Sequence, residues 1–177
     1  NRYMGEIVTP DVLTSLTKDE ALLDKILENA FARYYFRDET HPRPLEGQHY
    51  LIGEILKSYV KQTLKLDKQF TPFTYIASEY RFKSSYRVND QLEVSFKGSI
   101  DRIDRVGESL RIIDYKTGKG ETSFKEMATL FDASKNNRPY QILQVLIYGL
   151  FYLQENPGER ISPALYYLRS IYDKFDP

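Results

Sequence analysis

Cysteine and tryptophan are absent from this chain of 177 residues, and histidine occurs only twice. Without cysteine the chain can form neither a disulfide bond nor a cysteine-ligated zinc ion or iron–sulfur cluster. Excess charge of either sign is also missing, because 25 lysines and arginines balance 25 aspartates and glutamates. A neutral chain has no global basic field of the kind that holds nucleic acid, so any such binding must be local.

Long apolar runs and phosphate-binding loops are missing too. No run approaches the length of a membrane span and no signal peptide is recognisable, so we expect a cytoplasmic protein. A Walker-type loop is absent, which excludes an ATP-driven motor within this chain. The hydrophobic content of 41% in 177 residues suits one domain with a core. Because the first residue is Asn1 rather than Met, we expect a fragment of a longer protein.

The stretch from Gly98 to Gly118 carries the clearest pattern. Two apolar–polar alternating runs meet at Val106-Gly107-Glu108-Ser109, which predicts a β-hairpin with a two-residue loop. In that register Val106 faces Ser109 and Asp101 faces Asp114. Side chains alternate along a strand, so Lys116 lies on the same face as Asp114, and the pairing brings Asp101 to that face.

Two opposed aspartates call for a cation between them. Directly opposed strand residues have Cβ atoms about 4.5 to 5.5 Å apart, where like charges are destabilising. Mg²⁺ is usually held by one or two carboxylates with water and substrate phosphate, and a lysine beside it can orient a water or stabilise phosphate charge. The alternative is a solvated sheet face on which Asp101 pairs with Arg102 or Arg105 and Asp114 pairs with Lys116.

These residues also carry a family resemblance. Gly98-Ser-Ile-Asp101-Arg-Ile-Asp104, followed by Asp114-Tyr115-Lys116-Thr117-Gly118, resembles the GxxDRID and DYKTG motifs of RecB-like and AddB-like nucleases of the PD-(D/E)XK superfamily. The resemblance implies that Asp101, Asp114 and the Tyr115 carbonyl bind Mg²⁺ or Mn²⁺ and that Lys116 is catalytic. Several relatives carry a cysteine-bound iron–sulfur cluster, which this chain cannot form.

Two helices are expected before the sheet. The first begins near Thr17, with Thr17 or Asp19 as its cap, and runs to about Tyr35. Proline and histidine at 41–44 interrupt it, and a second helix from about Leu45 to Leu66 has the apolar stripe Leu51, Ile52, Ile55, Leu56, Tyr59 and Val60. In the family a histidine on such a helix often binds the metal, but here the only histidine near that position is His49. The further ligand therefore stays open between His49, a water, Glu54 and Glu79.

Three antiparallel strands should follow, at Phe73–Val88, Gln91–Val106 and the second half of the hairpin. A two-residue turn at Asn89-Asp90 places Glu79 opposite Ile100 and away from Asp101, whereas a bulge reverses that orientation. A weak short helix over Phe124–Phe131 comes next, and a final strand is expected over Ile161–Ile171.

The helix from Arg138 to about Gln154 is apolar nearly all round and should be buried. On it Gln141, Gln144 and Tyr148 share one face. Gln144-Val-Leu-Ile-Tyr148 resembles the QxxxY motif of the same nucleases, which implies that Gln144 supports the metal site or the DNA backbone and that Tyr148 borders the path of the strand. The alternative is a core tyrosine with a helix-to-sheet hydrogen bond.

Together these features predict an α/β (α+β) fold with a restriction-endonuclease-like αβββαβ core, a mixed central sheet flanked by helices. We expect one nuclease domain over 1–177, with a helical extension at 1–44 and the core at 45–172. The implied activity is metal-dependent hydrolysis of DNA phosphodiester bonds, expected to be exonucleolytic on single-stranded ends, in repair or recombination, beside a helicase domain or subunit. Alternatives are a catalytically inactive DNA-binding or scaffold module, and a sugar- or nucleotide-binding α+β domain in which the three charged residues do not converge.

Overall fold

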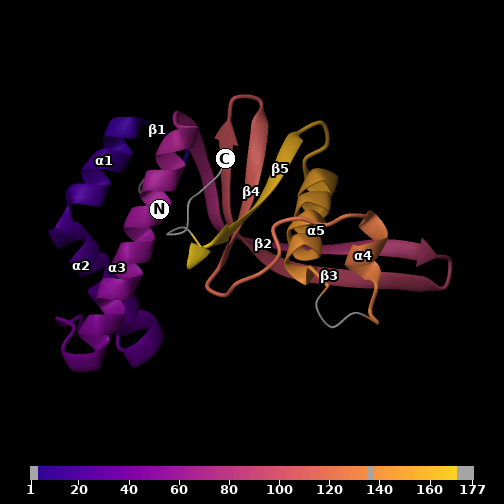
Figure 1. Cartoon of the computed structure of the whole chain (residues 1–177). Coiled ribbons are helices and arrows are strands. Elements are labelled where there is room, and N and C mark those ends of the chain that lie inside the picture. Colours follow the sequence, from indigo (N-terminus) through magenta and orange to yellow (C-terminus); the bar gives the residue numbers. More distant parts are fainter. Residues whose placement is uncertain (1–3, 135–137, 171–177) are drawn as a thin grey trace. The chain divides into compact units, whose positions relative to one another are not determined.

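The protein is described by a computed structural model covering residues 4–134 and 138–170. These residues fall into two compact units (Figure 1). The sheet unit comprises residues 4–7 and 73–170, and the helical unit comprises residues 8–72. Within the described residues no helix is long and apolar enough to cross a membrane.

The sheet unit is built on a mixed sheet with the strand order β1-β2-β3-β4-β5. Its strands are β1 (Ile7–Val8), β2 (Phe73–Asn89), β3 (Leu92–Val106), β4 (Ser109–Lys116) and β5 (Arg160–Tyr167). The pairs β2–β3 and β3–β4 are antiparallel, and β4–β5 is parallel. Helices α4 (Met127–Phe131) and α5 (Tyr140–Glu155) form the connection that the parallel pair requires.

The expected αβββαβ order is confirmed by the succession α3, β2, β3, β4, α5, β5, and the α/β class with it. The end of the last predicted strand needs correction, because β5 stops at Tyr167 and Ile171 lies outside the described residues. The sequence did not predict β1 or its pairing with β2. This strand is short, and Tyr75 donates its backbone N–H to the Glu6 carbonyl beside it, at 3.1 Å.

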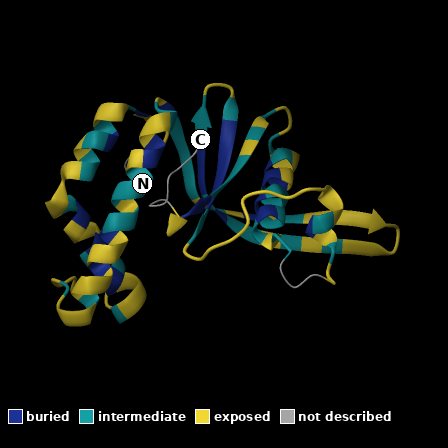
Figure 2. Ribbon diagram, in the orientation of Figure 1, coloured by how far each residue is buried: buried dark blue, intermediate teal, exposed yellow. Residues whose placement is uncertain are grey.

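The core of the sheet unit lies between α5 and one face of β3 and β4. Ile103 and Ile112 are paired across the ladder and fully buried, and they pack with Val145 and Phe151 of α5. Figure 2 shows β3 and β4 dark in the sheet, and β2 and β3 yellow towards the tip of the hairpin that joins them. The predicted burial of the 138–154 helix is confirmed only in part. Ile142, Val145 and Phe151 are buried, whereas Leu150 is exposed and the other predicted apolar residues of the helix are half-buried.

The other face of β3 and β4 buries charge. Arg111 donates to both carboxylate oxygens of Asp104, at 2.6 and 2.8 Å, and Arg102 lies 2.5 Å from the same carboxylate. Arg111 also donates to the Tyr166 hydroxyl, and both guanidinium groups lie over the Phe73 ring. A buried charge is tolerated only when it is paired, so this network holds β3 and β4 together on the face opposite α5.

The helical unit contains α1 (Pro10–Lys18), α2 (Glu20–Ala30), a π-helix at Phe31–Phe36, α3 (Gly47–Asp67) and a short 3-10 turn at Lys68–Phe70. Asp19 caps α2 by accepting the Leu22 N–H at 3.0 Å, which confirms one of the two predicted caps. The sequence prediction missed α1. Its start is marked by the Thr9 side chain, which accepts the Val12 N–H, and by Pro10 at the first helical position.

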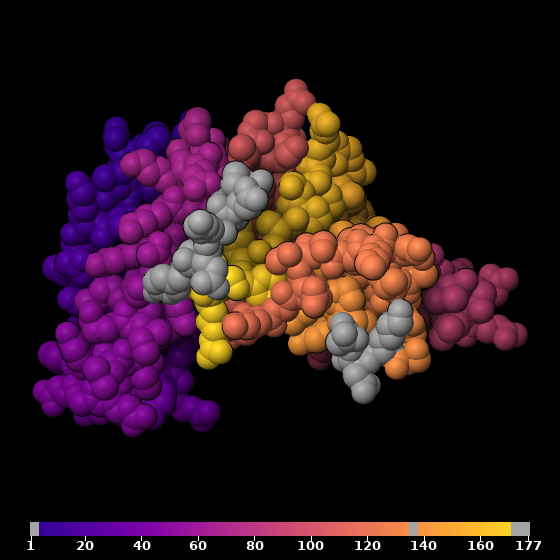
Figure 3. Space-filling model, in the orientation of Figure 1, coloured from indigo at the N-terminus to yellow at the C-terminus, as the bar shows by residue number. Residues whose placement is uncertain are grey.

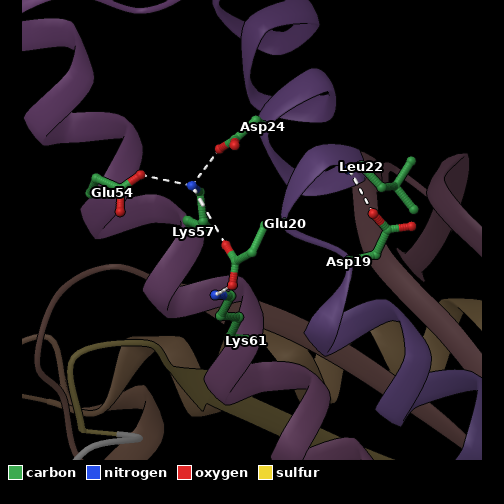
Figure 4. A network of polar contacts seen from close by, with 7 residues as sticks. All are labelled: Asp19, Glu20, Leu22, Asp24, Glu54, Lys57 and Lys61. Atoms are coloured by element: carbon green, nitrogen blue, oxygen red, sulfur yellow. Dashed lines mark hydrogen bonds and ion pairs between the residues drawn. The ribbon is translucent and has the colours of Figure 1, made fainter.

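The prediction that the apolar stripe of α3 is its buried face is wrong. Leu51 and Ile55 are more than half exposed, whereas Gly53 and Lys57 are buried. The reason is a charged network shown in Figure 4, in which Lys57 forms ion pairs with Glu54 of α3 itself and with Glu20 and Asp24 of α2. Lys61 also pairs with Glu20. The bonds to Asp24 and Glu54 raise the pKa of Lys57, so it stays charged.

Candidate active site

The hairpin of β3 and β4 has the register expected from the sequence. Val106 pairs with Ser109 around Gly107 and Glu108, and the ladder continues to Arg102 opposite Ile113. One step further the chain reaches Asp101 and Asp114. The prediction of a two-residue loop at this turn is confirmed, and Gly107 takes the positive φ of 57° that such a turn requires.

Asp101 lies at the point where the two strands begin to separate. Its Oδ2 accepts the backbone N–H of Tyr115 at 2.8 Å, so the carboxylate is tied to β4. Burial raises the pKa of Asp101, and the carboxylates of Asp114 and Glu79 raise it further, whereas the Tyr115 N–H and Lys116 lower it. Asp101 therefore lies near two like charges, as its predicted position opposite Asp114 implies.

Asp114 is more deeply placed, with 3% of the residue exposed. Its Oδ2 lies 2.5 Å from Lys116 Nζ but accepts no well-oriented hydrogen bond from any described residue. One half of the alternative is confirmed, because Asp114 pairs with Lys116. The other half is wrong: Asp114 is buried rather than solvated, and Arg102 and Arg105, the two cations considered for Asp101, pair with Asp104 and Glu159.

Lys116 connects Asp114 to α5. Its Nζ donates to Gln144 Oε1 at 3.0 Å, and Gln144 Nε2 donates to the Tyr148 hydroxyl at 2.6 Å. The structure thus brings together Asp101, Asp114, Lys116, Gln144 and Tyr148, the side chains singled out from three separate sequence motifs. Both ends of the Gln144 amide are bonded, so Gln144 orients the ammonium group from the helix side.

A family model described as the PD-(D/E)XK nuclease superfamily matches residues 2–175 of the chain. This chain belongs to the PD-(D/E)XK nuclease superfamily. A search of curated proteins gave no match. Membership in the superfamily supports a phosphodiester hydrolase with DNA as its substrate, and PD-(D/E)XK nucleases generally use divalent metal ions.

The face of the sheet on which Glu79 lies depends on the register of the β2–β3 pairing, which a shift of one residue reverses. The turn lies at Asp90 and Gln91 rather than at Asn89 and Asp90, and the register shifts by one residue between Arg87 and Asn89. Ser78 then pairs with Arg102 and Tyr80 with Ile100, so Glu79 falls opposite Asp101. The simple turn was wrong, and the bulge alternative describes the strand.

The backbone at Glu79 is unusual, with φ at +51° in the middle of a strand. A non-glycine residue in this left-handed region is strained, and such residues cluster at functional sites. Its Oε2 accepts a hydrogen bond from Ser99 Oγ at 3.2 Å. No local sequence signal marks this conformation, because only the long-range pairing of β2 with β3 imposes it.

Gly98, the first residue of the GxxDRID motif, has a packing reason. A Cβ atom at this position would lie 2.8 Å from two ring atoms of Phe82 and 3.1 Å from Tyr148 Cε1. Real Cβ atoms essentially never come as close as 2.8 Å, so a larger residue would push the Phe82 ring away, and the tight contact with Tyr148 would also have to lengthen. The motif glycine therefore keeps the QxxxY tyrosine close to the hairpin.

The residues present fit a divalent cation. The buried Asp114 Oδ2 without a hydrogen bond and the raised pKa of Asp101 are both relieved by a positive ion between the carboxylates. Within the described residues no three His, Cys, Asp or Glu side chains group closely enough to hold a metal by themselves. Backbone oxygen, water and substrate phosphate would complete the coordination, which is how Mg²⁺ is usually bound.

His49 and Glu54, the other two ligands left open by the sequence, belong to the helical unit. The His49 ring contacts Phe31, Tyr35 and Phe36 at centroid distances of 6.1, 5.0 and 5.2 Å. Glu54 is bound to Lys57 at 2.7 Å. Both side chains thus have structural partners within that unit.

Proposed function

We propose that this chain is a Mg²⁺- or Mn²⁺-dependent deoxyribonuclease in which Asp101, Asp114 and the Tyr115 carbonyl hold the ion and Lys116 is catalytic. The observation that carries the proposal is the pairing of a buried, incompletely bonded Asp114 with a lysine that Gln144 also binds. When bound, the ion would neutralise phosphate charge and lower the pKa of a water molecule.

The side chains of the protein do the positioning. Tyr115 N–H holds one oxygen of Asp101, which leaves its other oxygen for the ion. Lys116, held between Asp114 and Gln144, presents its ammonium group to the attacking water or to the charge that grows on the phosphate. Tyr148 fixes Gln144 in place and borders the path of the strand. Glu79 stands beside Asp101 as a further candidate ligand.

The finer assignments also rest on the motifs. GxxDRID, DYKTG and QxxxY support a RecB-like or AddB-like nuclease, and we propose exonuclease activity on single-stranded ends in DNA repair or recombination, with a helicase domain or subunit in the parent protein. A cytoplasmic location stays a prediction from composition.

One observation favours a second candidate, a scaffold or DNA-binding module without catalysis. No described cluster of three ligating side chains surrounds the two aspartates. In this case the fold would be retained and metal binding lost.

Cleavage assays separate these candidates. Purified protein with Mg²⁺ or Mn²⁺ should degrade end-labelled linear single-stranded DNA, and circular single-stranded DNA should resist if the activity is exonucleolytic. Asp114→Asn and Lys116→Ala should each lower the rate by at least about 10²-fold. The matched variants Glu108→Gln and Lys18→Ala, at exposed positions, should retain full activity. Cleavage that persists in Asp114→Asn would contradict the proposed mechanism.

A further inference from the structure

The part of the β2–β3 hairpin beyond Glu79, residues 80–100, extends well past α5 (Figure 1). We call it the arm. Its tip forms a separate lobe in Figure 3. The arm is long and regular, since the pairing from Tyr80 opposite Ile100 to Arg87 opposite Glu93 is continuous.

The two sides of the arm differ in what they contact. The inner side faces α5: Phe82 and Phe96 pack on Phe151 with ring centroids 5.7 and 4.8 Å apart. Ser84 donates to Gln154 at 2.9 Å, and Tyr80 donates to Glu155 at 2.7 Å. Since side chains alternate along a strand, the residues between these point away from α5. This outer side is formed by Arg81, Lys83, Ser85, Arg87, Glu93, Ser95, Lys97 and Ser99.

The outer side is strongly basic although the chain as a whole is neutral. It carries four cations, Arg81, Lys83, Arg87 and Lys97, and one acid, Glu93. All four cations are exposed, and within the described residues none forms an ion pair. Glu93 accepts a hydrogen bond from Ser85 at 2.5 Å.

One pair on this surface is unfavourable without a ligand. Lys83 lies directly opposite Lys97 in the ladder. Like charges in directly opposed strand positions are destabilising, so the pair is accommodated better when an anion lies against it. The opposed aspartates of the candidate active site form the same kind of pair with the opposite charge.

The basic row leads to the candidate active site. Arg81 pairs with Ser99, and the Ser99 hydroxyl binds Glu79, which stands opposite Asp101. From Arg81 to Arg87 the strand spans roughly 20 Å at about 3.4 Å per residue. Phosphates of a B-form strand recur about every 3.4 Å along its axis, so several of them fall within this length.

We propose that the outer side of the arm binds the phosphodiester backbone of DNA and guides the strand to Asp101 and Asp114. The inference rests on the proposed function for its substrate. The four cations of the arm provide a local basic surface on a chain that is neutral as a whole. Such a surface is needed because binding to the DNA backbone is dominated by contacts between phosphates and Lys or Arg.

The test compares two triple variants with the same loss of charge. Arg81→Gln/Lys83→Gln/Lys97→Gln changes the arm, and Lys18→Gln/Lys25→Gln/Lys65→Gln changes exposed lysines of the helical unit. Both are made in an Asp114→Asn background so that DNA stays intact. Fluorescence anisotropy with a labelled single-stranded 30-mer is measured from 50 to 200 mM KCl, and thermal melts verify folding.

The arm variant should bind at least tenfold more weakly at the lowest salt concentration. The slope of log K against log [KCl] should fall by about 2, because each lost phosphate contact on a single strand contributes roughly 0.7. The helical-unit variant should match its parent. Equal binding by the two triple variants, or displacement of the DNA by polyglutamate as readily as by unlabelled DNA, would overturn the proposal.

A small substrate separates this inference from the proposed function. Bis(p-nitrophenyl) phosphate is too small to reach along the arm, so with Asp114 intact the arm variant should hydrolyse it at the wild-type rate. If the wild-type protein fails to hydrolyse it or any DNA, while DNA binding still depends on the arm, the nuclease proposal fails and the arm proposal stands. A wild-type protein that does not bind the 30-mer at all refutes the arm proposal.

Discussion

Replacing Arg111 by methionine should destabilise the protein strongly, because it removes the bidentate partner of a buried carboxylate. Asp104 is fully buried and accepts two bonds from Arg111, at 2.6 and 2.8 Å. Breaking a buried ion pair by removing one partner costs about 3 to 5 kcal/mol. Methionine keeps much of the side-chain volume over Phe73, so lost packing adds little. At about 2 to 4 °C per kcal/mol for a chain of this size, the melting temperature should fall by about 6 to 20 °C.

Arg160→Met is the matched control for this change. Arg160 also pairs with a carboxylate, that of Glu108 at 3.2 Å, but the two side chains are 73% and 86% exposed. Exposed pairs contribute less than about 1 kcal/mol. Both variants can be measured by calorimetric or circular-dichroism melts in the absence of metal. If Arg111→Met costs no more than Arg160→Met, the claim that this network fixes β3 against β4 is wrong.

Three further predictions concern single side chains. The pKa of Asp101 is raised in the folded state, so stability is lost as pH rises from the ordinary pKa of an aspartate through the raised pKa. Metal-free Asp101→Asn should therefore melt at a higher temperature than wild type at pH 7 and at the same temperature below pH 3. A lower melting temperature of the variant at pH 7 would contradict this. Tyr148→Phe removes the acceptor of one Gln144 bond, worth about 1 kcal/mol, so single-turnover cleavage should slow about fivefold with unchanged DNA affinity, whereas an unchanged rate would remove Tyr148 from the site. Lys57→Met leaves Asp24 unpaired beside a buried methionine and should cost about 1 to 2 kcal/mol in urea unfolding; an unchanged midpoint would show that the network is not stabilising.

The hairpin of β3 and β4 could be predicted from the sequence because its information is local. Two alternating runs flank a two-residue loop, so counting from Val106 and Ser109 fixes every pair up to the aspartates. Capping of α2 by Asp19 was predictable for the same reason, since the cap bond spans three residues.

Features that depend on distant contacts could not be predicted in this way. A one-residue register shift near the β2–β3 turn decides on which face of the sheet Glu79 lies, ten residues away. No residue near Glu79 indicates that shift. Likewise, the apolar pattern of α3 does not show that Lys57 is the buried position, because its acidic partners include Asp24 and Glu20 of another helix.

The proposed function depends most on a divalent ion bound by Asp101 and Asp114. Isothermal titration of the metal-free protein with Mn²⁺ tests this, with Asp114→Asn, Asp101→Asn and the exposed control Glu108→Gln measured alongside. We expect Mn²⁺ binding by wild type and Glu108→Gln, a rise in melting temperature with Mn²⁺ concentration, and loss of both effects in the two aspartate variants. Undetectable binding by the wild-type protein, or undiminished binding by Asp114→Asn, would contradict the proposed function.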